Sequence, residues 1–184
     1  MKDLIKRNIN GKKVLLLFVL TNIIYVFMLT VTIPKVISFS GGMKILDMMP
    51  TGYDADYVNT LLSSLGVKGR DAYLYNQLPV DLIYPFMFAI SSMLVLAYFL
   101  NKIGKFDSNL FYFCLIPLGS GLFDYSENIG IIMMLKSFPD NSILLSQVTS
   151  VFSIVKSFST IFYFVILISF LLVFVWDKQL KKGK

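Results

Sequence analysis

The stretch "SFSTIFYFVILISFLLVFVW", residues Ser157–Trp176, contains no charged side chain. A helix that rises 1.5 Å per residue crosses a hydrocarbon core of roughly 30 Å in about 20 residues, and this stretch meets that length. Similar apolar blocks run over Val14–Ile33, Val80–Leu100 and Leu110–Leu135. Lipid offers the backbone no hydrogen-bond partners, and barrel strands would be shorter and alternate in polarity. The sequence therefore predicts an all-α membrane protein with four transmembrane helices in one bundle.

The composition and charge agree with this prediction. Of the 184 residues, 56% are hydrophobic and 15% are charged, and the mean hydropathy is +0.71; a soluble domain carries about 25% charge. Much of the positive charge flanks the apolar blocks. If the chain crosses the membrane four times, these flanking segments all lie on the same side. These basic residues are Lys2, Lys6, Arg7, Lys12, Lys13, Lys102, Lys105, Lys178, Lys181, Lys182 and Lys184. Because Lys and Arg mark the cytoplasmic side, we expect both termini in the cytoplasm of a cell-membrane protein, with no nucleic-acid partner.

The chain divides into three parts. Residues 1–13 form a basic cytoplasmic N-terminus, residues 14–176 form one four-span membrane domain, and residues 177–184 form a basic cytoplasmic tail. An outer loop, 38–77, separates the first two spans. Its segment "YDADYVNTLLSSLG" places four apolar residues on one helical face, namely Val58, Leu61, Leu62 and Leu65. This spacing predicts a short amphipathic helix that either lies on the outer membrane surface or forms a lid over the bundle.

Four ionisable residues interrupt the apolar blocks at a shared depth. At 1.5 Å per residue from the cytoplasmic ends of their helices, Asp81, Asp124, Glu127 and Lys156 all lie about 24–30 Å deep. Asn128 shares a helical face with the two acids of the third block. A charge that faces lipid near the bilayer centre costs about 2.5–3.5 kcal/mol, so these side chains are expected to face the bundle interior. They predict a polar pocket, open toward the outer side, in which Lys156 neutralises part of the charge of Asp124 and Glu127. The other expected lining residues are Asn22, Tyr25, Tyr84, Ser120, Ser153 and Thr160.

The residue inventory narrows the chemistry of this pocket. The chain has no histidine, and its one cysteine, Cys114, lies inside the third apolar block. Imidazole catalysis, histidine metal ligands, serine–histidine triads and intramolecular disulfides are therefore excluded. The spacing of the acids matches no dedicated metal-binding motif, so we expect no metal and no other cofactor.

Three classes of function fit such a pocket. It binds or transports a cationic or amphiphilic small molecule, with Asp124 and Glu127 as counter-ions. Alternatively, it is the site of a membrane-embedded enzyme that acts on a lipid or isoprenoid, with one carboxyl as acid, the other as base, and Lys156 stabilising negative charge. As a third class, the chain is an accessory subunit of a larger membrane complex, packed through the small residues Gly119–Gly121. Membrane lipids are expected to contact the protein in each case. A homo-oligomeric assembly is compatible with all three classes of function.

One layout resemblance bears on the first two classes. The chain combines four apolar blocks, a long outer loop after the first, acids near the start of the second and a basic C-terminal tail. This layout resembles the sterol-isomerase and sigma-2-receptor type of four-helix membrane protein. In that family, carboxylates in a membrane pocket bind amine ligands or carry out sterol isomerisation. The resemblance is one of layout, so it assigns no role to an individual residue here.

Overall fold

The computed structural model describes residues 2–182, and within this range the chain forms helices and no strands. The α-helices are α1 (Lys2–Asn8), α2 (Gly11–Phe27), α3 (Ile33–Ile37), α4 (Ala55–Ala72), α5 (Leu78–Asp81), α6 (Tyr84–Lys102), α7 (Ile116–Ser137) and α8 (Ile143–Lys182). Tighter or wider helical turns join them: η1 (Met28–Thr32), η2 (Leu46–Met48), η3 (Tyr73–Gln77) and η4 (Asn109–Leu115).

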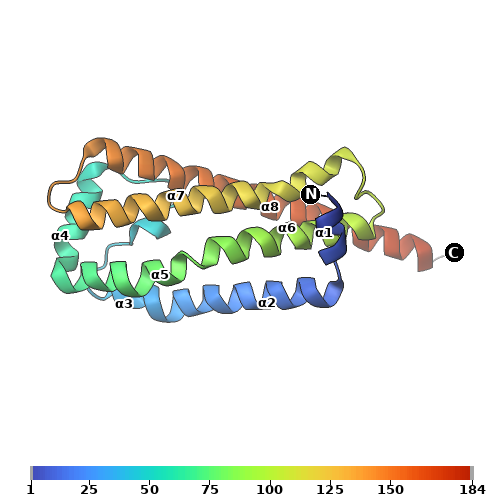
Figure 1. The fold of residues 1–184 in the computed structure, drawn as a ribbon, viewed down its shortest axis with the longest axis horizontal. Helices are drawn as coiled ribbons and strands as arrows, with labels where there is room; N and C mark the ends of the chain where they lie inside the picture. The colour runs from blue at the N-terminus through green and yellow to red at the C-terminus, as the bar shows by residue number, and fades with distance from the viewer. Residues whose placement is uncertain (1, 183–184) are drawn as a thin grey trace.

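The long helices α2, α6, α7 and α8 run lengthwise, with α2 packed on α6, α6 on α7, and α7 on α8 (Figure 1). The N-terminus, α1 and the C-terminal end of α8 lie at one end of the bundle (Figure 1). Helix α4 crosses the opposite end, beside the turn that joins α7 to α8 (Figure 1). The chain therefore passes along the bundle in alternating directions and returns both termini to the same end.

Three helical stretches among the described residues are long and apolar enough to cross a membrane. They are Gly11–Ile37, Ala55–Lys102 and Ile143–Leu180. This supports a membrane location. Helix α7 is not among the three, although the apolar block Leu110–Leu135 was expected to span. Its polar residues Ser120, Asp124, Glu127 and Asn128 are buried, while the side chains that it exposes include Leu122, Ile129 and Met133 and, in its last turn, Lys136.

Prolines mark the places where the long helices change geometry. A π-helical turn, Met28–Thr32, precedes Pro34, and α6 begins at Tyr84 and Pro85 after a break at Leu82 and Ile83. Proline has no N–H, so it fits near a helix start, where that donor has no partner within the helix. As a result, Asp81 stands at the end of α5, just before this break.

The loop between the first two long helices folds against the bundle. Asp54 accepts a hydrogen bond from the backbone N–H of Tyr57 at 2.7 Å and caps α4. The apolar face of α4, made of Val58, Leu61, Leu62 and Leu65, is buried in one cluster with loop residues Ile45 and Leu46 and α7 residues Ile131 and Met134. Protein therefore covers this face, which leaves none of it for contact with lipid.

Two close helix approaches set the bundle's packing. A Cβ atom on Gly121 would lie 3.0 Å from the carbonyl oxygen of Pro85, and one on Gly130 would overlap the side chain of Thr149. Small residues allow such approaches between membrane helices. Gly121, one of the small residues Gly119–Gly121, lies in the α6–α7 contact within this chain.

Candidate functional site

Lys156 on α8 joins the two acids of α7. Its Nζ lies 3.3 Å from Oδ1 of Asp124 and also forms an ion pair with Oε2 of Glu127. All three side chains are largely buried. The close packing of α7 on α8 brings them together, as their equal depth in the sequence suggested. An ammonium between two carboxylates compensates part of the cost of burying their charge.

Neutral polar groups surround this ion triad. The hydroxyl of Ser153 donates to Oε1 of Glu127. Asn128 donates through Nδ2 to the backbone carbonyl of Asp81 at 3.1 Å, which ties α7 to the end of α5. The hydroxyls of Ser120 and Thr160 lie 2.8 Å apart, linking α7 and α8 one turn further along. These contacts hold the polar stripes of the two helices in register.

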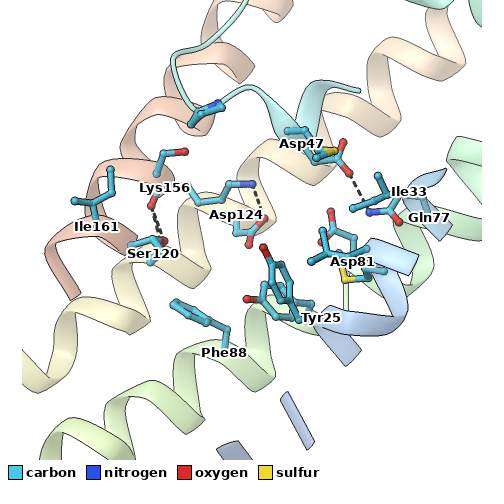
Figure 2. A pocket seen from close by; sticks show the side chains of 17 residues that line it. Tyr25, Ile33, Asp47, Gln77, Asp81, Phe88, Ser120, Asp124, Lys156 and Ile161 are labelled. Atoms are coloured by element: carbon cyan, nitrogen blue, oxygen red, sulfur yellow. Dashed lines mark hydrogen bonds and ion pairs between the residues drawn. The ribbon is translucent and has the colours of Figure 1, made fainter. Parts of the chain in front are cut away.

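Beside the triad lies a cavity of about 360 Å³, which Figure 2 shows from close by. Its lining comprises Tyr25, Met28, Leu29, Ile33, Asp47, Met48, Pro50, Gln77, Asp81, Tyr84, Phe88, Ser120, Asp124, Lys156, Ser157, Thr160 and Ile161. The lining is mostly apolar, and the charged groups gather at one side. Such an apolar pocket with a few converging polar groups is typical of small-molecule sites.

Asp81 is the acid of this cavity that the fold leaves unsatisfied. Its side chain is 3% exposed, and its Oδ2 is buried without a hydrogen-bond partner among the described residues. Lys156 forms ion pairs with Asp124 and Glu127, but none is found with Asp81. Figure 2 shows Asp81 between Asp47 and Asp124, directed into the same space. A buried carboxylate without a partner is costly, so this position calls for a cation or a proton.

Asp47 is a cavity acid that the sequence analysis missed. It follows Leu46 in the short turn η2, where the hydroxyl of Tyr73 donates to it and Nε2 of Gln77 lies 3.1 Å away. The hydroxyl of Thr32 in turn donates to Oε1 of Gln77. The loop around Asp47 has no apolar period that assigns it a depth. The one sequence feature that could have indicated Asp47 is its position directly after the apolar pair Ile45 and Leu46.

Aromatic rings form another wall of the cavity. Tyr25 and Tyr84 are stacked with their ring centroids 5.5 Å apart, and Phe88 lies 5.8 Å from Tyr84. Figure 2 shows the rings of Tyr25 and Phe88 below Asp124. Aromatic faces attract cations. The cavity thus offers negative charge on one side and ring faces on another.

The structure divides the residues expected from the sequence into three groups. Those that line the cavity are Tyr25, Asp81, Tyr84, Ser120, Asp124, Lys156 and Thr160. Those that lie behind it, and are wholly or almost wholly buried, are Glu127, Asn128 and Ser153. The expectation for Asn22 needs correction: it is exposed, donates to the carbonyl of Phe18 in its own helix at 2.7 Å, and lines a different cavity. It shares that cavity with Tyr25 and Tyr84, which line the acidic cavity as well.

Negative groups outnumber positive ones around the cavity. Asp47, Asp81 and Asp124 line it, and Glu127 lies behind it, against the single ammonium of Lys156. The nearby phenol of Tyr53 adds no charge, because burial raises its pKa above the usual range. The cavity is therefore suited to a positively charged guest.

No protein-family model, curated protein or solved structure matches this chain. The cavity itself therefore carries the evidence on function. The layout resemblance to sterol isomerases and the sigma-2 receptor likewise transfers no residue role.

Proposed function

We propose that the chain is a four-span protein of the cell membrane with both termini in the cytoplasm. Two observations support α7 as the fourth crossing: its acids and Asn128 are buried, and the side chains that it exposes before its last turn include Leu122, Ile129 and Met133. The basic residues of α1, of the turn after α6 and of the last turns of α8 then share the end that carries both termini (Figure 1). In this orientation the acidic cavity lies toward the outer side, with the loop 38–77 and α4 as its lid.

Within this arrangement, we propose that the cavity binds a cationic small molecule. The observation that carries this proposal is Asp81, a buried carboxylate that lines the cavity and lacks a partner for Oδ2 among the described residues. An ammonium group placed between Asp81 and Asp47 would compensate both charges. It would also lie beside the faces of Tyr25 and Tyr84, where a desolvated cation gains about 2 kcal/mol or more.

The geometry favours binding over catalysis by paired carboxyls. That reaction would need both Asp124 and Glu127 to reach the substrate, yet Glu127 does not line the cavity. Its two oxygens are engaged by Lys156 and by the hydroxyl of Ser153. Glu127 therefore serves to hold Lys156, while Asp81 and Asp124 face the guest.

The test is ligand-induced thermal stabilisation of the purified protein in one detergent, across a panel of primary, tertiary and quaternary amines. Each amine is paired with the alcohol of the same carbon skeleton, which carries no charge. We expect amines to raise the unfolding temperature and the alcohols to have no effect. Asp81→Asn should remove the response, since it keeps the shape of the side chain and loses the charge.

The matched control is Asp140→Asn, which removes an exposed acid from the turn between α7 and α8. It should respond to amines as the original protein does. If Asp81→Asn still responds fully, the cavity does not bind cations through this carboxylate, and the proposal fails.

A further inference from the structure

A second cavity, of about 200 Å³, adjoins the acidic one. Its lining comprises Phe18, Thr21, Asn22, Tyr25, Tyr84, Phe88, Ser91, Ser92, Thr160, Tyr163 and Phe164. Four of these residues, Tyr25, Tyr84, Phe88 and Thr160, also line the acidic cavity. The two spaces are therefore neighbours that share the aromatic wall.

The second cavity carries no charge, and several of its polar groups already have partners. The hydroxyl of Thr21 donates to the carbonyl of Leu17 at 2.8 Å, and that of Thr160 donates to the carbonyl of Lys156 at 2.9 Å. Asn22 donates within its own helix. The remaining surface is rich in aromatic rings. This space therefore suits an apolar group, in contrast to the acidic cavity beside it.

Both cavities lie along the seam between α2 and α8. Helix α2 packs on α6 and α8 packs on α7, but within the described chain α2 and α8 make little contact with each other. The residues at this seam are partly exposed: Leu29 is 39% exposed, Tyr25 41% and Ile161 59%. In a membrane, an apolar seam of this kind faces the hydrocarbon chains of lipids.

The outer end of the bundle is closed by the loop that carries Asp47. The backbone N–H of Tyr53 donates to the hydroxyl of Ser150 on α8 at 2.8 Å. Next to it, Gly52 approaches α8 so closely that a Cβ atom would lie 2.6 Å from that hydroxyl oxygen. On the other side of the bundle, the hydroxyl of Tyr73 accepts from the N–H of Leu46 at 3.1 Å. The loop is thus fixed to both sides of the bundle.

The opposite end is closed by apolar packing. Beyond Ser92, the next turns of α6 bury Leu96 and Leu100 against Phe111 of η4 and Phe170 of α8. The second cavity shares the rings of Phe88 and Tyr163 with this cluster, and no serine, threonine or asparagine of its lining belongs to the cluster. Access along the bundle axis is therefore closed at both ends, which leaves the seam between α2 and α8.

We propose that the two cavities form one site for a single amphiphilic amine that enters from the bilayer between α2 and α8. This inference rests on the proposed cation binding. The ammonium lies among Asp81, Asp124 and Asp47, and the hydrocarbon chain passes the rings of Tyr84 and Phe88 into the second cavity. Within α6, from Tyr84 to Ser92, the helix rises about 12 Å at 1.5 Å per residue, so the site suits a long single-chain amine.

The first test uses dodecylamine that carries a diazirine at its chain terminus, with the protein reconstituted in phospholipid vesicles. After illumination, peptide mass spectrometry locates the label. We expect labelling on the segments that line the second cavity, on α2 near Phe18–Tyr25 and on α8 near Thr160–Phe164. Labelling spread evenly over the lipid-facing residues of all helices would overturn the inference.

The second test narrows the second cavity from its exposed rim with Asn22→Phe. The control is Ile23→Phe, which adds a ring to the neighbouring exposed residue, one that lines neither cavity. Asn22→Phe should weaken dodecylamine binding about tenfold. This is the change expected when roughly two methylene groups of the ligand are no longer buried. It should leave thermal stabilisation by butylamine unchanged, and Ile23→Phe should change neither amine.

Asp81→Asn separates the two proposals. If it abolishes stabilisation by butylamine while Asn22→Phe leaves dodecylamine binding intact, the chain site is wrong and the cation site stands. If Asp81→Asn changes the response to neither amine, cation binding itself fails, and the amphiphile site fails with it.

Discussion

The ammonium of Lys156 lies 3.3 Å from Oδ1 of Asp124, across the contact between α8 and α7. The same ammonium forms an ion pair with Glu127, which is fully buried. One positive charge therefore serves two acids on neighbouring turns of α7. This sharing explains how an apolar helix tolerates two carboxylates, and it leaves Asp81 across the cavity without a positive partner.

The first prediction concerns this shared charge. Lys156→Met should destabilise the protein by about 3–5 kcal/mol, because it leaves buried carboxylates without a counter-ion. Adding Glu127→Gln to Lys156→Met should restore part of the loss, because one of the uncompensated charges is removed. Thermal unfolding of the three proteins in one detergent measures both effects.

Lys136→Met is the control for this experiment, since Lys136 is an exposed lysine at the end of α7. It should change the unfolding temperature little. A double variant no more stable than Lys156→Met alone would show that Glu127 does not depend on the lysine.

The second prediction concerns the close approach of α7 and α8 at Gly130. Gly130→Ala places a Cβ atom 2.7 Å from Cγ2 of Thr149, so the helices must separate. Overpacking of this kind costs about 1–3 kcal/mol. Gly119→Ala on the same helix meets nothing within 4 Å and should be neutral or slightly stabilising. Thermal unfolding of the two variants side by side tests the packing, and equal effects at both glycines would contradict it.

The membrane made part of the site predictable from the sequence. A membrane-spanning helix has a known rise per residue and a known minimum length. Asp124, Glu127 and Lys156 could therefore be assigned a shared depth from their distance to the helix ends. Their helical faces then followed from the spacing. The ion pairs of Lys156 agree with both inferences.

The rest depended on contacts that spacing does not encode. A polar stripe gives the face of a helix but not which residue reaches a cavity, so Glu127 was expected in the pocket and lies behind it. Asp47 stands in a loop without helical periodicity, where no depth can be assigned. The apolar face of α4, which includes Leu61, was visible in the sequence. Whether lipid or protein covers this face depends on Ile45 and Leu46, which lie outside α4 and do not belong to its helical periodicity.

The third prediction concerns the anchor of the loop 38–77. Tyr73→Phe removes the hydroxyl that donates to Asp47 and accepts from the N–H of Leu46. A buried polar group left unsatisfied costs about 1–3 kcal/mol. The variant should therefore unfold at a lower temperature and be cut faster by protease between α3 and α4. Tyr75→Phe, at an exposed tyrosine two residues away, should behave as the original protein does; equal sensitivity of both variants would argue against the anchor.

The last prediction tests the membrane topology with single cysteines. The native Cys114 is fully buried, so it serves as a blank for a membrane-impermeant maleimide. Lys44→Cys, in the outer loop, and Lys136→Cys, near the turn between α7 and α8, should be labelled in intact cells. Lys105→Cys, at the exposed turn after α6, should be labelled only after permeabilisation.

Labelling of Lys44→Cys without Lys136→Cys would show that α7 does not cross the membrane, because the turn after it would then remain on the cytoplasmic side. Labelling of Lys105→Cys alone in intact cells would reverse the orientation, and the acidic cavity would then face the cytoplasm.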